Sequence, residues 1–249
     1  MDLANKKVIV TGAASGFGLT LVERLVEESC QIAAFDIDQN KLSALKSRYP
    51  AVSIYVCDVS DNEQVESNVE SVFKDFNGLD ILVNNAGIMK NAPLINLFNR
   101  NERKHSIQMW HDVISINQNS VFYMSRSVVD RMLENRNKGV IINISSIAAC
   151  GNIGQTAYSA SKAAVEAMTK TWAKELGRFG IRAVAISPGF IDTQATSDAL
   201  EEKMLQKWTD NTPLKRTGNI EEIIHAIIFA IQNDFYNGEV LKVNGGLVL

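Results

Sequence analysis

Tyr158 and Lys162 stand four residues apart in a segment whose apolar spacing predicts a helix over residues 156–177. Residues at positions i and i+4 share one face of a helix, so the phenol and the ammonium are expected to lie close together. A free phenol has a pKa near 10, and nearby cations lower it because they stabilise the phenolate. A shift of about three units takes roughly 4 kcal/mol. A tyrosine in this setting can take a proton from an alcohol or give one to a carbonyl oxygen.

Two hydroxyl groups follow a second predicted element. Residues 140–144 form a short apolar run typical of a buried strand, and Ser145 and Ser146 come directly after it. Open α/β sheets place their ligands at the carboxyl ends of their strands. The sequence therefore predicts that a serine hydroxyl and the Tyr158–Lys162 pair meet in one site.

A glycine-rich turn, Thr11–Gly18, separates a predicted strand over residues 8–11 from a helix beginning near Leu19. Its glycines, Gly12, Gly16 and Gly18, allow a tight turn and a close approach of the backbone to a phosphate. Backbone N–H groups and the positive end of the helix dipole favour an anion there. We interpret this turn, Ser15 included, as the binding site for the pyrophosphate of a dinucleotide, although a glycine-rich turn can also be purely structural.

Asp36 ends the second predicted strand, which covers residues 32–35. A carboxylate at this position can accept both hydroxyls of the adenosine ribose, and it repels a 2′-phosphate by roughly 4 kcal/mol at about 4 Å and an effective dielectric of about 20. No lysine or arginine occurs among residues 37–40 to offset that repulsion, and Ser15 is not basic. The sequence predicts NAD rather than NADP. The alternative is that Asp36 only caps the next helix.

Strands and helices alternate along the whole chain, which indicates a doubly wound parallel sheet of about seven strands with helices on both faces. The other expected strands cover residues 52–56, 81–83, 183–186 and 240–243, and the other expected helices cover residues 19–26, 41–48, 65–76, 107–133, 200–208 and 220–231. No linker interrupts the pattern. We expect one domain over residues 1–249.

The composition excludes several classes of protein. The 249 residues carry a net charge of −3 with a pI of about 5.7, and no clustered basic excess points to nucleic acid. No apolar run reaches the ~18 residues of a membrane span, and no secretory signal precedes the first strand. The three cysteines and three histidines lack the spacing of metal ligands. We expect a cytoplasmic protein that binds no metal, nucleic acid or membrane.

The motifs together resemble the short-chain dehydrogenase/reductase family, in order and spacing over essentially the whole chain. They are Thr11–Gly18, Asn84–Gly87, Ile144–Ser146, Tyr158–Lys162 and Pro188–Gly189. The resemblance implies a single-domain Rossmann fold, a homotetramer or homodimer, and a catalytic tetrad of Asn117, Ser146, Tyr158 and Lys162. In this family the serine holds the substrate oxygen, the tyrosine is the acid/base, the lysine binds the nicotinamide ribose and the asparagine completes a proton path.

The resemblance also assigns cofactor contacts by position. Asp58 resembles the adenine contact, and the segment Asn85–Gly87 resembles the turn behind the adenosine ribose. The implied cofactor-binding residues are Gly12, Ser15, Gly16, Phe17, Gly18, Asp36, Ile37, Asp58, Val59, Asn85, Ala86, Gly87, Tyr158, Lys162, Pro188, Gly189, Ile191 and Thr193. Phe17 replaces the family's usual small aliphatic residue.

Several alternatives stay open at this point. The loop from Ser146 to Tyr158 is about one residue shorter than in the family, so Ser145 is a second candidate for the catalytic hydroxyl, and Asn119 competes with Asn117. Residues 96–106 form an insertion, which we interpret as a polar and basic surface loop or as a rim for a phosphate-bearing thioester. The polar segment 194–212, which includes Trp208, either closes over the substrate or forms a surface helix. Cys150 and Gln155 are candidates to line the substrate pocket.

The predicted activity is hydride transfer between NAD(H) and a secondary alcohol or ketone. Likeness to the 3-hydroxyacyl-CoA and hydroxysteroid dehydrogenase branch favours a 3-hydroxyacyl or 3-oxoacyl thioester, although 3-oxoacyl-carrier-protein reductases usually prefer NADP. A small secondary alcohol, a steroid or a polyol is the alternative substrate. A non-catalytic NAD(H) sensor is a more remote alternative, because such proteins commonly lose the tyrosine or the lysine.

Overall fold

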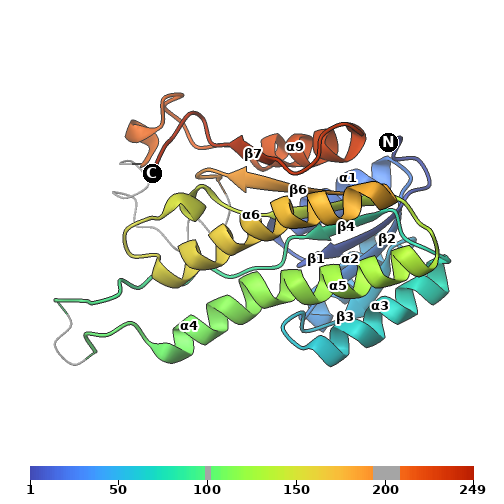
Figure 1. The fold of residues 1–249 in the computed structure, drawn as a ribbon, viewed down its shortest axis with the longest axis horizontal. Helices are drawn as coiled ribbons and strands as arrows, with labels where there is room; N and C mark the ends of the chain where they lie inside the picture. The colour runs from blue at the N-terminus through green and yellow to red at the C-terminus, as the bar shows by residue number, and fades with distance from the viewer. Residues whose placement is uncertain (99–101, 193–207) are drawn as a thin grey trace.

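The computed structural model describes residues 1–98, 102–192 and 208–249, and its centre is a seven-stranded parallel sheet (Figure 1). The strand order is β3-β2-β1-β4-β5-β6-β7. The strands are β1 (Lys7–Thr11), β2 (Gln31–Asp36), β3 (Ser53–Val56), β4 (Ile81–Asn84), β5 (Gly139–Ile144), β6 (Ile181–Pro188) and β7 (Val240–Val243). The order reverses between β1 and β4, which is where open α/β sheets hold their ligands.

The central strands carry continuous apolar runs because helices cover both of their faces. Val8 and Val10 of β1 pack on one side with the apolar faces of three helices, whereas Ile9 between them packs on the other side. The helices on the side of Val8 and Val10 are α1 (Gly16–Glu27), α2 (Gln39–Arg48) and α9 (Ile220–Gln232). The helices on the side of Ile9 are α3 (Asn62–Phe76), α5 (Ser120–Glu134) and α6 (Thr156–Leu176). The predicted fold class is confirmed.

Among the elements that the structure describes, the long helix expected over residues 107–133 differs from the prediction in its internal form. It consists of α4 (Ile107–Ile114), one turn of π-helix at Ser115–Asn119, and α5. The widened turn places Asn117 in the interior, where its side chain is fully buried. The expected helix over residues 200–208 lies almost wholly outside the described residues. No helix among the described residues is long and apolar enough to cross a membrane.

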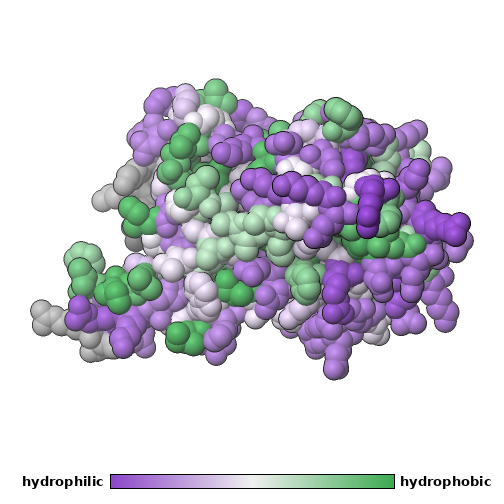
Figure 2. Space-filling model, in the orientation of Figure 1, coloured by the Kyte–Doolittle hydropathy of each residue, from purple (hydrophilic) through white to green (hydrophobic). Residues whose placement is uncertain are grey.

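The insertion before α4 forms an arm, which we define as residues 94–98 and 102–105. Its two sides pair through an antiparallel bridge between Ile95 and Lys104 and a hydrogen bond from His105 N to the carbonyl of Leu94 at 2.9 Å. The expectation of a polar loop is only partly right, because Leu97 and Phe98 are 69% and 100% exposed beside the basic residues. Figure 2 shows this apolar surface on the projecting part of the molecule.

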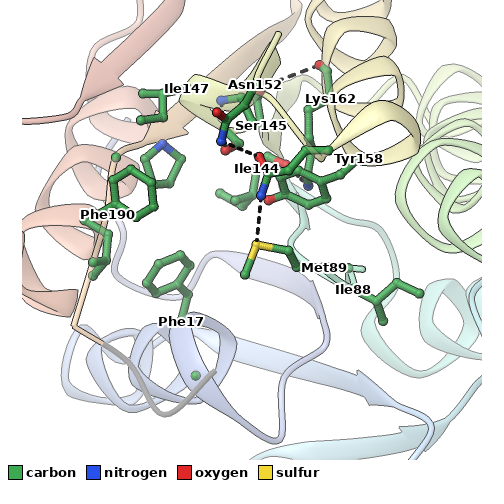
Figure 3. A pocket seen from close by; sticks show the side chains of 18 of the residues that line it. Phe17, Ile88, Met89, Ile144, Ser145, Ile147, Asn152, Tyr158, Lys162 and Phe190 are labelled. Atoms are coloured by element: carbon green, nitrogen blue, oxygen red, sulfur yellow. Dashed lines mark hydrogen bonds between the residues drawn. The ribbon is translucent and has the colours of Figure 1, made fainter. Parts of the chain in front are cut away.

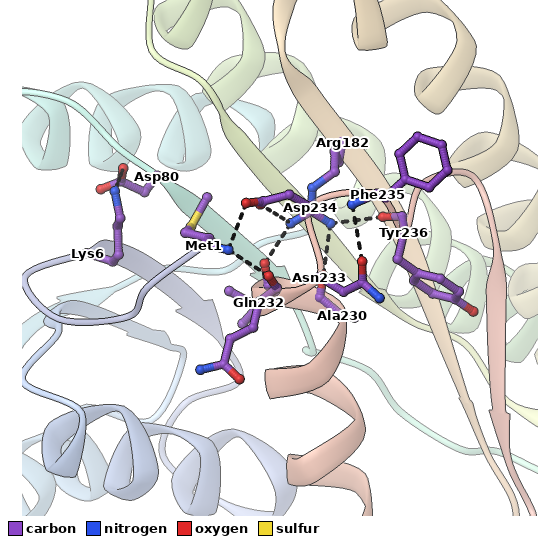
Figure 4. A network of polar contacts seen from close by, with 11 residues as sticks. Met1, Lys6, Asp80, Arg182, Ala230, Gln232, Asn233, Asp234, Phe235 and Tyr236 are labelled. Atoms are coloured by element: carbon purple, nitrogen blue, oxygen red, sulfur yellow. Dashed lines mark hydrogen bonds and ion pairs between the residues drawn. The ribbon is translucent and has the colours of Figure 1, made fainter.

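Arg182 of β6 anchors the end of α9 to the sheet (Figure 4). Its guanidinium is nearly buried and donates to the carbonyls of Ala230, Ile231 and Tyr236 at 2.6 to 2.9 Å. Asp234 lies 3.6 Å from the same guanidinium and also binds the ammonium of Met1 at 3.0 Å. These contacts satisfy carbonyls that a helix end leaves without partners, and they fix the strand that leads to Pro188.

Candidate active site

A pocket of about 940 Å³ lies at the carboxyl ends of the central strands (Figure 3). It brings together most of the residues that the sequence singled out. From the predicted set it is lined by Gly12, Ser15, Gly16, Phe17, Asn85, Ala86, Gly87, Ser146, Tyr158, Lys162, Pro188, Gly189 and Ile191. Segments far apart in the sequence therefore share one cavity, as the strand–helix pattern predicted.

Ser146, rather than Ser145, faces the phenol. The Ser146 hydroxyl lies close enough to the side chain of Tyr158 to lower the pKa of the phenol. The Ser145 hydroxyl is buried and donates instead to Oε1 of Glu166 at 2.9 Å. Successive residues of an extended chain point to opposite sides, so only one of the two hydroxyls can face the phenol. This geometry favours Ser146 as the hydroxyl that meets a substrate oxygen.

Lys162 is held beneath the phenol ring. Its ammonium is almost fully buried, donates to the carbonyl of Ile144 at 2.7 Å, and lies 5.8 Å from the centroid of the Tyr158 ring. Burial lowers the pKa of Lys162 to about 8. Burial raises the pKa of Tyr158, against a lowering contribution from the Ser146 hydroxyl. In the protein alone the phenol is therefore protonated at neutral pH, and the lowering expected from the lysine does not outweigh the desolvation.

The depressed pKa of Lys162 predicts a pH-dependent stability. An unfolded lysine keeps its proton up to a pH of about 10.4, whereas folded Lys162 loses it near pH 8, so the free energy of unfolding should rise between these values. Between pH 8 and 10 the wild type should gain about 2 to 3 kcal/mol relative to Lys162→Met. Chemical denaturation across this range measures the gain. Lys170→Met, which removes an exposed lysine of the same helix, is the control, and parallel curves for wild type and Lys162→Met would contradict the prediction.

Asn117 joins the π-turn to the segment after β4. Its amide donates to the carbonyl of Ile88 at 2.8 Å and accepts from the N–H of Ile88 at 2.7 Å, with a third contact to Ser161 Oγ at 3.4 Å. The neighbouring Gly87 has room for this amide because it has no side chain: a Cβ there would lie 3.2 Å from Asn117 Oδ1. Asn117 therefore supports the pocket from behind and does not line it.

The glycine-rich turn is fastened to the segment after β4. Asn85 donates from its side chain to the carbonyls of Thr11 and Gly12 at 3.0 and 3.1 Å, and Thr11 Oγ1 accepts from the N–H groups of Asn85 and Ala86. Ser15 precedes α1 without a side-chain capping bond, and the first turn of α1 has no acidic residue. The positive end of this helix is thus left available to an anion.

Gly18 and Gly16 have different roles in this turn. A Cβ on Gly18 would lie 2.1 Å from the carbonyl oxygen of Gly12, whereas a Cβ on Gly16 would meet no heavy atom within 4 Å. We predict that Gly18→Ala lowers the free energy of unfolding by about 1 to 3 kcal/mol through overpacking. Gly16→Ala, at a φ of +51°, should cost about 1 to 2 kcal/mol and act mainly on dinucleotide binding. Denaturation of both variants measures the loss of stability, and NADH titration measures the loss of affinity. If the two variants had equal stabilities and equal affinities for NADH, the different roles given to Gly16 and Gly18 would be wrong.

Asp36 is oriented by the backbone around it. Its carboxylate accepts from the N–H groups of Ala14 and Asp38 at 3.0 Å each. The cap of α2 is Asp38, whose side chain accepts from Asn40 and Lys41, so Asp36 is not the helix cap. Asp36 lies beside the glycine-rich turn at the carboxyl end of β2, outside the lining of the pocket.

Seven of the predicted cofactor-site or catalytic residues do not line the pocket or cannot be placed. Asp36 ends β2, Ile37, Asp58 and Val59 follow β2 and β3, Gly18 is buried in α1, and Asn117 lies behind the wall, whereas Thr193 falls outside the described residues. Cys150 is exposed and does not line the pocket, but Gln155 does. Its side chain donates to Asn91 at 3.0 Å and accepts from Asn152 at 3.0 Å.

Apart from Phe17 and Trp208, which were named from the sequence, the apolar wall of the pocket was not predicted. Phe190 stacks on Trp208 with the ring centroids 4.5 Å apart, and Figure 3 shows Phe17 and Phe190 across the cavity from Tyr158. Ile88, Met89, Ile147 and Ile153 complete this wall. The apolar residues directly after Gly87 and Gly189 were the feature of the sequence from which this wall could have been predicted. Within the described ranges, no three His, Cys, Asp or Glu residues are grouped to hold a metal ion.

Comparison with known proteins relates the sequence of this chain to several enzymes. The family model described as enoyl-(acyl carrier protein) reductase matches residues 12–248. A 3-oxoacyl-[acyl-carrier-protein] reductase of Thermotoga maritima is 38% identical, with all of both chains covered. A gluconate 5-dehydrogenase of Gluconobacter oxydans is 32% identical over 100% of this chain and 96% of its own. A 5-keto-D-gluconate 5-reductase of Escherichia coli is 33% identical over 100% and 97%.

Proposed function

The chain belongs to the short-chain dehydrogenase/reductase family and is an oxidoreductase acting on CH–OH and C=O groups, and on that premise we propose that it interconverts a 3-oxoacyl thioester and the 3-hydroxyacyl thioester with NAD(H). The observation that carries the choice of substrate is the lining of the pocket. Among the described residues that line it, Lys162 is the only one with a charged side chain, and its ammonium is already bound to Ile144.

A ketogluconate would be poorly matched by this lining. It carries a carboxylate and several hydroxyl groups, and burying a charge without a partner is costly. The wall formed by Phe17, Met89, Ile147 and Phe190 instead suits an apolar acyl chain. Reduction of a keto sugar acid is the second candidate, because two of the relatives above are named as a gluconate 5-dehydrogenase and a 5-keto-D-gluconate 5-reductase.

We assign the acid/base step to Tyr158. In the direction of reduction, the phenol gives its proton to the substrate oxygen as that oxygen gains negative charge. The raised pKa of Tyr158 keeps the phenol protonated and ready for this step. Ser146 donates a hydrogen bond to the same oxygen, and Lys162 holds its charge beneath the ring. Asn117 holds the segment at Ile88 that borders the reacting centre.

The residues of the first half of the chain fit a nicotinamide dinucleotide. A Cβ on Gly12 would lie 3.0 Å from Cα of Ala86, so the turn can close only with glycine there, and the uncapped start of α1 is open to the pyrophosphate. When bound, the nicotinamide donates or accepts the hydride. Asp36 supports NAD over NADP, because its carboxylate is fixed at the end of β2 where a 2′-phosphate would approach it.

We further propose a homotetramer, with a homodimer as the alternative, in a reducing cytoplasm. Exposed apolar side chains on the arm and on α4 and α5 support self-association, among them Phe98, Ile107, Phe122 and Leu133. The three cysteines are unpaired, which suits a reducing compartment. Light scattering during gel filtration measures the number of subunits, and a monomer at micromolar concentration would refute the assembly.

The substrate assignment is tested by initial rates with NADH and two ketones, acetoacetyl-CoA and 5-keto-D-gluconate. We expect kcat/KM for the thioester to exceed that for the keto acid by at least about 100-fold, because a buried polar mismatch alone costs a few kcal/mol. Phe190→Ala should lower the rate with the thioester. It should also reduce the preference for the thioester over the keto acid. A higher kcat/KM for 5-keto-D-gluconate would overturn the assignment in favour of the second candidate.

A further inference from the structure

A set of polar contacts joins the carboxyl end of β5 to one face of α6. Lys162 and Glu166 are one helical turn apart, and Thr169 follows on the same face. Each is paired with one of the three consecutive residues 143–145. Lys162 Nζ donates to the carbonyl of Ile144 at 2.7 Å, Glu166 accepts from Ser145 Oγ at 2.9 Å, and Thr169 Oγ1 accepts from the side-chain amide of Asn143 at 2.9 Å. Glu166 is the one acidic member of this set.

Ser145 is the point at which Glu166 acts on the pocket. Its hydroxyl is buried, with only 3% of the residue exposed, and the Glu166 carboxylate is a stronger acceptor for it than the Lys162 carbonyl at 3.4 Å. The backbone N–H of Ser145 donates to the carbonyl of Ile186 at 2.7 Å. The residue is therefore held from β6 through its backbone and from α6 through its side chain.

The residues on either side of Ser145 carry the groups proposed to act in catalysis. The carbonyl of Ile144 holds the Lys162 ammonium, and the Ser146 hydroxyl lies close enough to Tyr158 to lower the pKa of its phenol. A rotation of the backbone at Ser145 would displace both groups. Figure 3 shows Ile144, Ser145, Tyr158 and Lys162 gathered in this one corner of the pocket.

We propose that Glu166 is a positioning residue, whose carboxylate fixes Ser145 and thereby sets the distance of Ser146 and Lys162 from Tyr158. The proposal rests on the catalytic roles assigned above. Glu166 does not itself line the pocket, and its hydrogen bond is with Ser145, which does line it, so its effect must pass through Ser145. It is partly exposed at its outer side, unlike Ser145, and its replacement leaves the pocket itself unaltered in composition.

The test is a double-mutant cycle on kcat with Glu166→Ala, Ser145→Ala and the double variant, using whichever of acetoacetyl-CoA and 5-keto-D-gluconate the wild type reduces faster. We expect Glu166→Ala to lower kcat by about 10- to 100-fold, since small misplacements of reacting groups have effects of this size. The KM for NADH should change less than about twofold. Because both residues act through one hydrogen bond, the double variant should be no slower than the slower single variant.

Two further variants separate positioning from a general effect on folding. Glu166→Gln keeps an acceptor oxygen for Ser145 and should recover most of the lost kcat. Glu175→Ala removes an exposed acidic residue from the same helix and should leave kcat unchanged. Unchanged kcat in Glu166→Ala, or effects of Glu166→Ala and Ser145→Ala that multiply in the double variant, would overturn the proposal.

Amide hydrogen exchange gives a readout that needs no substrate. Loss of the Glu166 contact should speed exchange in the peptide spanning residues 143–148, to the same extent in Glu166→Ala and Ser145→Ala, and leave the peptide of β4 unchanged. Equal protection in wild type and Glu166→Ala would refute the contact's role. If the wild type reduces neither acetoacetyl-CoA nor 5-keto-D-gluconate, the proposed function fails. The exchange experiment still decides whether Glu166 holds Ser145.

Discussion

Replacing Tyr158 by phenylalanine is expected to lower kcat for ketone reduction by about 10²- to 10⁴-fold, the usual contribution of a positioned acid/base group. The variant removes only the phenolic oxygen, whose pKa the Ser146 hydroxyl lowers, and it keeps the ring that lies 5.8 Å from the Lys162 ammonium. The ring continues to fill the same partly buried space, so packing is preserved. Steady-state rates at saturating ketone and cofactor measure the loss.

Binding of NADH provides the control for this variant. Phenylalanine at position 158 should leave the dissociation constant of NADH, followed by its fluorescence, within about threefold of the wild type, since a single hydrogen bond contributes about 0.5 to 1.5 kcal/mol. Ser146→Ala should also lower kcat, by less than Tyr158→Phe, because it removes a hydrogen-bond donor and not the proton. A Tyr158→Phe enzyme with near-normal kcat would show that another group supplies the proton.

Replacing Asp36 by asparagine is expected to shift the ratio of kcat/KM for NADH over NADPH toward NADPH by about 10- to 1000-fold. The range corresponds to the repulsion between a carboxylate and a phosphate, about 1 to 4 kcal/mol between the dielectric of water and that of a protein surface. Asparagine keeps an oxygen that can accept one of the two N–H groups now bound to Asp36. The change in ratio therefore reports the charge more than the loop geometry.

Asp38 offers a matched control, because it is a carboxylate two residues further along. It caps α2 by accepting from Asn40 and Lys41, and asparagine is an equally good cap. Asp38→Asn removes the same charge without touching the expected ribose site, so its cofactor ratio should stay within about threefold of the wild type. Equal shifts in the two variants would mean that net charge, and not the position of Asp36, sets the preference.

The sheet could be predicted because its strands carry their own signal. Continuous apolar runs such as Ile32–Phe35 occur only where both faces are covered, and a glycine-rich turn after Thr11 marks the start of the first crossover helix. The predicted β7, residues 240–243, matches the structure at both ends. The local pattern is sufficient here because parallel strands joined by helices leave few alternative topologies.

The details of the site could not be predicted from the sequence, because they depend on contacts between residues that are far apart in the chain. Both Ser145 and Ser146 follow β5, and only the contact of one with Glu166 and of the other with Tyr158 distinguishes them. The π-turn at Ser115–Asn119 has no sequence signal that an ordinary helix lacks, because it is sustained by the contacts of Asn117 with Ile88. The apolar surface of the arm was not predicted, because the basic residues of this segment led to the expectation of a polar loop.

The proposed activity is tested most directly by the wild-type enzyme, with absorbance at 340 nm followed in the presence of acetoacetyl-CoA and either NADH or NADPH at equal concentrations. Asp36 and the apolar pocket together predict rapid oxidation of NADH, with kcat/KM for NADH at least about tenfold above that for NADPH. A preference for NADPH would contradict the role given to Asp36. No oxidation of either cofactor, with NADH bound tightly, would contradict the proposed reduction of a thioester ketone and favour a protein that senses NAD(H) or acts on another carbonyl.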